Sequence, residues 1–107
     1  MNEYNAKIVK VVDGDTYVSE ISLGFSLTLN AKIRLAKVNC PELPTPEGEK
    51  AKAWAIANLE GKSVKIQTKS YDKYGRVLAA VQLDGKDVGE TLLSEGLAEK
   101  YLGLEED

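Results

Sequence analysis

The chain of 107 residues, with 43% hydrophobic and 29% charged side chains, has the length and composition of one soluble globular domain. Its net charge of −3 argues mildly against a general nucleic-acid binder, because such proteins are usually basic. The sequence contains no His and one Cys, which excludes Ser-His and Cys-His nucleophile systems, His-rich zinc sites and an internal disulfide. Any catalysis must therefore use carboxylates, Lys, Arg, Tyr or a metal held by oxygen ligands.

No stretch of the sequence has the features of a membrane span or an export signal. Its apolar runs fall well short of the roughly 18 residues that suggest a membrane-spanning helix. The first four residues, Met1-Asn2-Glu3-Tyr4, lack the basic and apolar regions of a signal peptide. We therefore expect one domain over residues 1–107, no membrane partner and a monomer, cytoplasmic unless a signal has been trimmed from a secreted precursor.

The first third of the chain is predicted to form three strands. Residues 6–21 are rich in β-branched side chains, and Asp13-Gly14 between them favours a type I′ hairpin turn with positive φ. Gly24 marks the next turn. Apolar and polar residues then alternate strictly over residues 26–35, which predicts a half-buried antiparallel strand. The alternation stops at residues 36–37, where we expect a bulge or the end of the strand.

A loop and a helix are predicted next. Three prolines make residues 39–46 a loop. Thr45 is a suitable N-cap and Pro46 a suitable first residue for a helix, which Gly61 is expected to end. Within this helix, Trp54 lies on the apolar face and is interpreted as a core residue.

Two further strands and a short helix complete the prediction. Residues 64–68 and 76–83 have strand character, and Asp84-Gly85 marks a turn after the second of them. Asp87 is expected to cap a short helix that ends at Gly96. Five short strands with one helix between the third and fourth are typical of the OB-type Greek-key barrel, an α+β fold that is mainly β. An SH3-like barrel is the alternative, although it does not normally insert a four-turn helix at that point.

Closing such a barrel would bring together the ends of several strands that carry charged residues. Asp13, Asp15 and Glu42 would then be neighbours, with Arg34 and Arg76 beside them. Three close carboxylates need a cation, hard oxygen ligands favour Ca²⁺ or Mg²⁺, and guanidinium groups bind phosphate oxygens. The pattern is thus suited to phosphodiester hydrolysis. Each piece also has a simpler interpretation, as a turn, a structural ion pair or solvated surface charge.

At these residues the sequence resembles the staphylococcal nuclease family. Three segments carry the resemblance in order: Val11-Val12-Asp13-Gly14-Asp15-Thr16, then Ile33-Arg34-Leu35 running to Pro41-Glu42, and Asp72-Lys73-Tyr74-Gly75-Arg76. The similarity covers roughly residues 6–100. It implies an OB barrel with helices and a Ca²⁺-dependent nuclease that hydrolyses DNA and RNA, with single strands as substrate, and leaves 3′-phosphates.

The resemblance also implies a role for each matching residue. Asp15, Asn39, the backbone carbonyl of Cys40 and Glu42, directly or through a water, would surround Ca²⁺ or another hard divalent cation, with Asp13 close by but not a ligand. Glu42 would orient or deprotonate the attacking water, and Arg34 and Arg76 would hold the phosphate. The residues expected to contact the nucleotide are Lys73, Tyr74 and Tyr101.

Asn39 departs from the family pattern, in which an Asp that binds the metal precedes this Pro-Glu step. A neutral ligand in place of an anionic one is expected to weaken the binding of a hard cation. Two hypotheses follow: an active nuclease with reduced Ca²⁺ affinity, or a nuclease-like module that binds nucleic acid or protein without cleaving it. The presence of Arg34, Glu42 and Arg76 together favours the enzyme.

Overall fold

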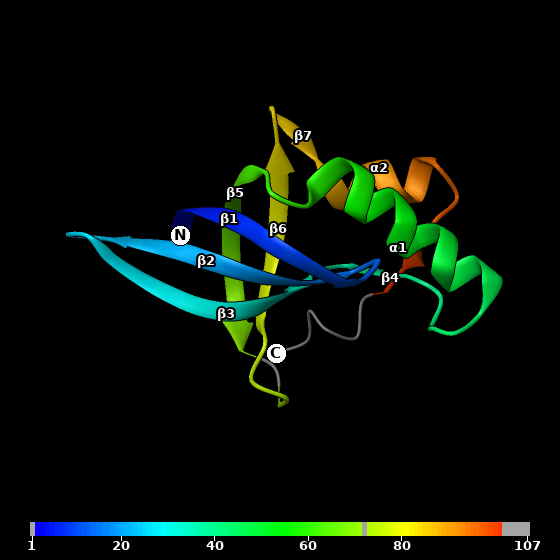
Figure 1. Cartoon of the computed structure of the whole chain (residues 1–107), viewed down its shortest axis with the longest axis horizontal. Coiled ribbons are helices and arrows are strands. Elements are labelled where there is room, and N and C mark those ends of the chain that lie inside the picture. The colour runs from blue at the N-terminus through cyan, green and yellow to red at the C-terminus, as the bar shows by residue number, and fades with distance from the viewer. Residues whose placement is uncertain (1, 72, 102–107) are drawn as a thin grey trace.

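The computed structural model describes residues 2–71 and 73–101, and these residues form eight strands and two helices (Figure 1). The N-terminal half contains β1 (Asn2–Asp13), β2 (Thr16–Gly24), β3 (Leu27–Leu35), β4 (Val38–Asn39) and α1 (Pro46–Leu59). The C-terminal half contains β5 (Ser63–Tyr71), β6 (Val77–Leu83), β7 (Lys86–Asp87), α2 (Val88–Ser94) and β8 (Glu99–Lys100).

The five long strands close into a barrel. Their order in the sheet is β3-β2-β1-β5-β6, with antiparallel neighbours throughout, and β7 extends the sheet beyond β6. The barrel closes because β3 and β6 also pair in parallel, through Ile33–Leu35 and Val77–Ala79. The predicted OB-type barrel is confirmed, with α1 between the third and fourth long strands. In the described part of the chain, no helix has the length and apolar character needed to cross a membrane.

Alternating side chains from the barrel strands fill its core, and α1 covers one end (Figure 1). The small side chains of Ala51 and Ala55 let this helix approach the barrel closely, and Leu59 anchors its last turn. Trp54 is half-buried and packs against the core, as predicted. The largest fully buried side chains are Tyr17, Ile8, Ile21, Ile33, Leu35, Leu59, Ile66, Leu78 and Leu92.

Both helices begin at the caps that the sequence predicts. The Thr45 hydroxyl accepts a hydrogen bond from the Gly48 amide at 3.0 Å, and Pro46 opens α1. Asp87 caps α2, its carboxylate accepting the Glu90 amide at 2.9 Å. Each cap satisfies one of the unpaired amides of a first helical turn, so the starts of both helices are locally encoded.

The β1–β2 hairpin is confirmed, but the predicted reason for its glycine is wrong. Gly14 is not among the residues with positive φ, so the turn is not the type I′ turn expected from Asp13-Gly14. A Cβ at this position would lie 2.7 Å from the Cβ of Ala51 and 2.8 Å from the Sγ of Cys40. Gly14 is therefore required because α1 and the residues after β4 pack directly against the turn.

β3 ends at Leu35, where the sequence predicts a break, and Lys37 reverses the chain with a φ of 72°. The residues after this reversal differ from the prediction. Asn39, expected in a loop, belongs to β4 and pairs with Glu99 of β8. The amide of Tyr101 also donates to the carbonyl of Lys37 at 2.8 Å. The C-terminal segment therefore fixes β4 against the end of the barrel.

Candidate active site

A cleft of about 520 Å³ opens beside the β1–β2 turn, the end of β3 and the loop between β5 and β6. Asp72 lies outside the described residues, so it is not included here. The cleft brings together all ten residues that the sequence predicts for the site, and adds Thr16 and Pro41. The lining residues are Asp13, Asp15, Thr16, Arg34, Asn39, Cys40, Pro41, Glu42, Lys73, Tyr74, Arg76 and Tyr101.

The floor of the cleft holds a buried pair of opposite charges. Asp15 is 6% exposed and Arg34 is 5% exposed. The Asp15 Oδ2 atom lies 3.5 Å from the Arg34 Nη2 atom and accepts the Cys40 amide at 2.8 Å. Thr16 lies beside them, its hydroxyl 3.4 Å from the other Asp15 oxygen. Because Thr16 and Arg34 are register partners in β2 and β3, the strand pairing itself places Asp15 next to this guanidinium.

Arg34 is held by the backbone at the end of β3. Its Nη1 atom donates to the carbonyls of Leu35 at 2.6 Å and Val38 at 2.9 Å, and its Nη2 atom donates to the Asn39 side-chain oxygen at 3.0 Å. These contacts cross the break between β3 and β4. Arg34 therefore stabilises the local fold as well as supplying charge, and truncating it would leave buried carbonyls without their donor.

Glu42 reaches the same cleft from the loop before α1, and its side chain is exposed. Its backbone carbonyl accepts the Thr45 hydroxyl at 2.6 Å and the Thr45 amide at 3.2 Å. A Cβ on Gly48 would collide with that same carbonyl. The N-terminal turn of α1 thus fixes the position of Glu42 while leaving its carboxylate in solvent.

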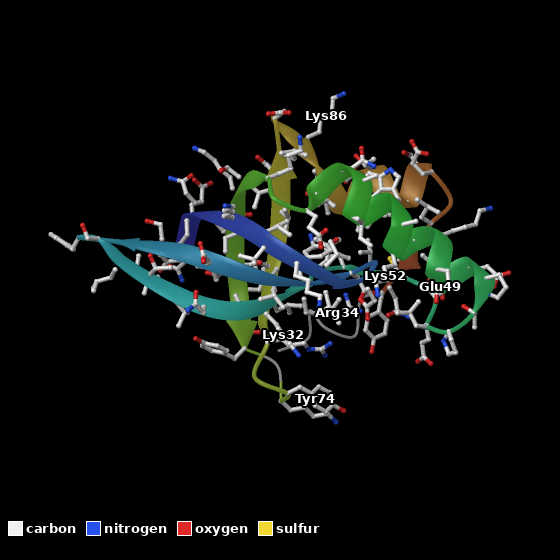
Figure 2. All side chains as sticks on the ribbon, in the orientation of Figure 1. Lys32, Arg34, Glu49, Lys52, Tyr74 and Lys86 are labelled. Atoms are coloured by element: carbon white, nitrogen blue, oxygen red, sulfur yellow. The ribbon has the colours of Figure 1, made fainter. Side chains whose placement is uncertain are left out.

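Tyr74 extends from the loop between β5 and β6, away from the body of the barrel (Figure 2). Its ring is 72% exposed. The Lys73 ammonium lies 5.4 Å from the ring centre and the Arg76 guanidinium carbon lies 5.2 Å from it. Two cations against one aromatic face keep the loop's positive charge next to a surface on which a base can stack.

Burial raises the pKa of Asp15 from its usual 3.8 to about 6. A hydrogen bond with Asp13 raises it further, whereas the Arg34 charge and the Cys40 amide lower it. Burial likewise raises the pKa of the Cys40 thiol to about 12, which keeps this side chain neutral. The floor therefore carries a carboxylate whose negative charge is only partly balanced by the protein.

This imbalance predicts a pH dependence for the metal-free protein. Because the pKa of Asp15 is higher in the folded state, ionisation of this carboxyl opposes folding above pH 6. Its contribution should become favourable as the pH falls from about 7 to about 4, by up to about 3 kcal/mol. Urea unfolding in EDTA should detect this as a difference between the parent and Asp15→Asn, since the amide can still accept the Cys40 N–H. Parallel stability profiles for the two proteins would contradict the prediction.

A second prediction concerns the support of Glu42. Gly48→Ala should displace the Glu42 backbone, because the added methyl group meets its carbonyl oxygen. A shift of that size in a catalytic group typically costs about tenfold to a hundredfold in rate. Steady-state cleavage assays would measure the loss, and Gly89→Ala in α2 is the control, since its nearest contact is a looser 3.2 Å to the Asp87 side chain. Equal rates for the parent and Gly48→Ala would contradict this role of the helix.

Oxygen atoms dominate the ligands that the cleft offers to a metal. The carboxylates of Asp15 and Glu42, the amide oxygen of Asn39 and the carbonyl of Cys40 are the candidates, and such donors suit a hard cation. Within residues 2–71 and 73–101, no group of three or more His, Cys, Asp and Glu side chains converges as a metal site. The residues therefore fit Ca²⁺, with part of the ligand set neutral.

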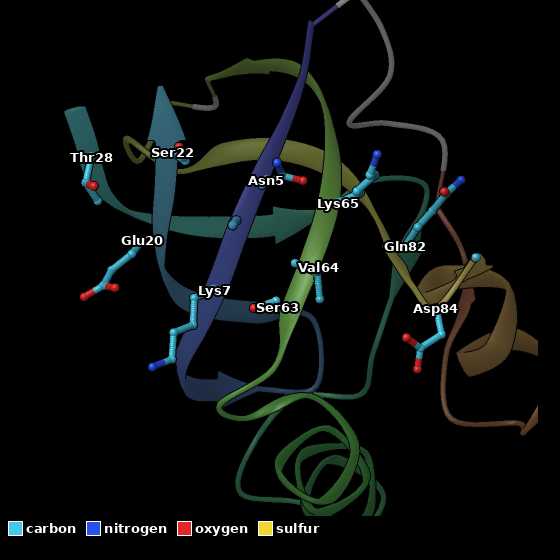
Figure 3. A pocket seen from close by; sticks show the side chains of 12 residues that line it. Asn5, Lys7, Glu20, Ser22, Thr28, Ser63, Val64, Lys65, Gln82 and Asp84 are labelled. Atoms are coloured by element: carbon cyan, nitrogen blue, oxygen red, sulfur yellow. The ribbon is translucent and has the colours of Figure 1, made fainter. Parts of the chain in front are cut away.

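A larger hollow, of about 680 Å³, lies elsewhere on the outer face of β1, β2 and β5 (Figure 3). Its charged side chains are Lys7, Lys65, Glu20 and Asp84, and all its polar residues are exposed. Lys7 and Glu20 are register partners on neighbouring strands. This hollow is a solvated sheet face of mixed charge, without the buried ion pair that distinguishes the smaller cleft.

Comparison with known proteins adds an independent finding. The family described as "Staphylococcal nuclease homologue" matches residues 32–106. The chain is 34% identical over 74 residues to staphylococcal-like nuclease CAN1 of Arabidopsis thaliana, an alignment covering 69% of this chain and 23% of the relative. It is 36% identical over 103 residues to endonuclease YncB of Bacillus subtilis, covering 88% and 46%. It is 30% identical over 105 residues to the thermonuclease of Staphylococcus hyicus, covering 91% and 59%.

The chain thus spans about a quarter to three-fifths of the length of these relatives. The family match covers well over half of the chain and includes the end of β3, Glu42 and the loop that carries Arg76. The closed barrel agrees with the fold that the sequence resemblance implies. The chain belongs to the staphylococcal nuclease family.

Proposed function

We propose that the protein is a Ca²⁺-dependent nuclease that hydrolyses phosphodiester bonds of single-stranded DNA or RNA and leaves 3′-phosphates. The observation that carries the proposal is one cleft that combines a buried carboxylate, two guanidinium groups and an exposed carboxylate. Relatives named as nucleases support the same reaction. No described residue group offers a competing nucleophile, because the chain has no His and its single Cys is buried and neutral.

Ca²⁺ bound beside Asp15 would polarise the phosphate and balance the charge of the carboxylate that the protein itself leaves partly uncompensated. Asp15, Asn39, the Cys40 carbonyl and Glu42 are proposed to hold it. Asp13 acts through its hydrogen bond to Asp15. The neutral amide of Asn39 predicts a weak site, because Ca²⁺ affinity follows the charge of the ligands.

Glu42 is proposed to orient and deprotonate the attacking water. Its carboxylate is exposed and its backbone is fixed, so it can accept a proton without any change in the fold. Arg34 and Arg76 line the same cleft, and their guanidinium groups are proposed to stabilise the charge that builds on the phosphate. Arg34 is anchored by three oxygens, so it holds one fixed direction.

The rest of the cleft is proposed to bind the nucleotide. Tyr74 presents an exposed ring with cations against it, a combination that binds an unpaired base and its phosphate. Lys73 and Tyr101 complete this wall of the cleft. A base must be unstacked to reach such a ring, which favours single-stranded nucleic acid as the substrate.

A binding module without catalysis is the second candidate, and Asn39 is the observation that favours it. Its side-chain oxygen already accepts a hydrogen bond from Arg34, so it is less available to a metal than a carboxylate would be. In that case the cleft would bind nucleic acid or protein in the absence of metal. The intact set of Arg34, Glu42 and Arg76 supports the enzyme over this alternative.

Substitution of Arg76 tests the proposed function. Arg76→Ala should lower Ca²⁺-stimulated cleavage of a single-stranded DNA oligonucleotide by about 10² to 10³, and Arg76→Lys should restore little, because a lysine cannot bind phosphate bidentately. Urea unfolding of each variant establishes that the fold is intact. Lys69→Ala, on the exposed end of β5 and outside the cleft, is the control. Cleavage by Arg76→Ala at the parent's rate would reject the proposed site.

A further inference from the structure

The β2–β3 hairpin extends beyond the barrel to the end of the molecule opposite the helices (Figure 1). Its two strands pair from Thr16 with Arg34, beside the cleft, to Gly24 with Leu27 at the tip. Eight residues of strand correspond to about 26 Å. The tip is therefore remote from the candidate active site and from the main core.

The tip of this hairpin exposes apolar side chains. Phe25 is 98% exposed, Leu27 is 60% exposed and Leu23 is 43% exposed. On β3, exposure falls from Leu27 through half-buried Leu29 to fully buried Ile33, so the core-facing side of the strand continues past the part of the barrel that covers it. No described residue buries the side chains at the tip.

The backbone of the turn is equally unusual. Phe25 and Ser26 form the two-residue turn between the strands, with φ values of 54° and 65°. Turns with positive φ at both central positions strongly favour Asn-Gly, and a bulky aromatic residue is disfavoured there. A strained residue that also exposes its whole side chain suggests that the Phe25 ring has a binding role.

β3 also has a free edge next to this tip. It pairs with β2 along its length, but with β6 only through Ile33–Leu35. Over Leu27–Lys32 its other edge has no strand partner within the described residues. Charged residues, prolines and bulges usually protect such edges. Residues 27–31 contain no charge and no proline, and β3 shows no register shift there.

We propose that this hairpin is a homotypic interface, at which a second copy of the chain packs its own hairpin tip and pairs antiparallel along β3. The argument for a second copy is charge. Residues 21–31 contain no charged side chain, so two such segments meet without like charges opposed, although each chain carries a net charge of −3. The same absence of Lys and Arg makes the tip unsuited to nucleic-acid phosphates. This inference goes beyond the proposed nuclease function and departs from the monomer expected from the sequence.

The size of the interface predicts a weak dimer. Burying Phe25, Leu27 and Leu23 from two copies removes on the order of 700 Å² of apolar surface, below the roughly 1,200 Å² of a stable complex. Pairing of the β3 backbones adds directional hydrogen bonds to this apolar contact. We therefore expect dissociation constants in the micromolar range or weaker.

Sedimentation velocity of the whole chain from about 10 μM to about 1 mM tests the proposal. The parent should shift from monomer to dimer. The double variant Phe25→Asn/Ser26→Gly should raise the dissociation constant at least tenfold while folding at least as stably, because Asn-Gly suits this turn. Leu27→Lys should also remain monomeric, by placing like charges at the interface. Ile56→Ser, which removes an equally exposed apolar side chain from α1, should still dimerise.

Three results would overturn the proposal. One is a parent protein that stays monomeric at the highest concentration, and another is a dimer that persists in the double variant. The third is loss of the dimer in Ile56→Ser, which would locate the contact on α1. If the parent is monomeric and Phe25→Ser lowers affinity for single-stranded DNA, the tip contacts nucleic acid and the homotypic interface is rejected.

Discussion

Glu42→Gln is expected to reduce cleavage of single-stranded DNA by at least about a hundredfold, the usual contribution of a positioned general base. The amide has nearly the shape of the carboxylate but accepts no proton. The side chain is exposed and its backbone is held through the Glu42 carbonyl, so the substitution should leave stability unchanged. Initial rates in saturating Ca²⁺, together with urea unfolding, measure the two effects separately.

Glu47→Gln is the matched control for this variant. Glu47 is also an exposed carboxylate and lies only five residues away, in the first turn of α1, but it does not line the cleft. The control should cleave at the parent's rate. Full activity of Glu42→Gln would remove Glu42 from the mechanism, and equal losses in both variants would indicate a general effect of charge on substrate binding.

The second large effect is a gain of metal affinity in Asn39→Asp. The new carboxylate adds one negative charge to the ligands, and Arg34, which donates to this side chain at 3.0 Å, is placed to tolerate it. The Ca²⁺ concentration needed for half-maximal cleavage should fall by about tenfold or more, because affinity follows ligand charge. Titrating Ca²⁺ against cleavage by the parent and the variant measures this directly.

Asn5→Asp is the control for added charge, because Asn5 is exposed on β1, outside the cleft. It should leave the Ca²⁺ requirement unchanged. An unchanged requirement in Asn39→Asp would show that residue 39 does not bind the metal. A shift of the same size in Asn5→Asp would attribute the gain to net charge alone.

The sequence predicts the parts of this fold that depend on local chemistry. The strand alternation over residues 26–35, the caps at Thr45 and Asp87 and the break after Leu35 all follow from neighbouring residues, and the structure confirms them. Closure of the barrel follows from the number and order of strands. It brings Asp15, Arg34, Glu42 and Arg76 to one cleft, although the roles assigned to them stay predictions.

Features that depend on contacts between distant segments were not predictable in this way. Gly14 is explained by its contacts with Cys40 and Ala51, which no local turn rule contains. The pairing of Asn39 with Glu99 depends on where the C-terminal segment returns. Thr16 was missed as a cleft residue because its hydroxyl is significant only beside the buried Asp15. Exposure of Phe25 is likewise a consequence of how far the hairpin extends past the barrel.

The most direct test of the central claim is to measure binding and cleavage of one fluorescent single-stranded DNA oligonucleotide by the same protein, in EDTA and in Ca²⁺. If the cleft is a nuclease active site, Ca²⁺ should produce cleavage with 3′-phosphate ends, EDTA should abolish it, and Glu42→Gln should bind the oligonucleotide without cleaving it. Binding that persists in EDTA with no cleavage in Ca²⁺, Mg²⁺ or Mn²⁺ would contradict the account and identify the chain as a binding module.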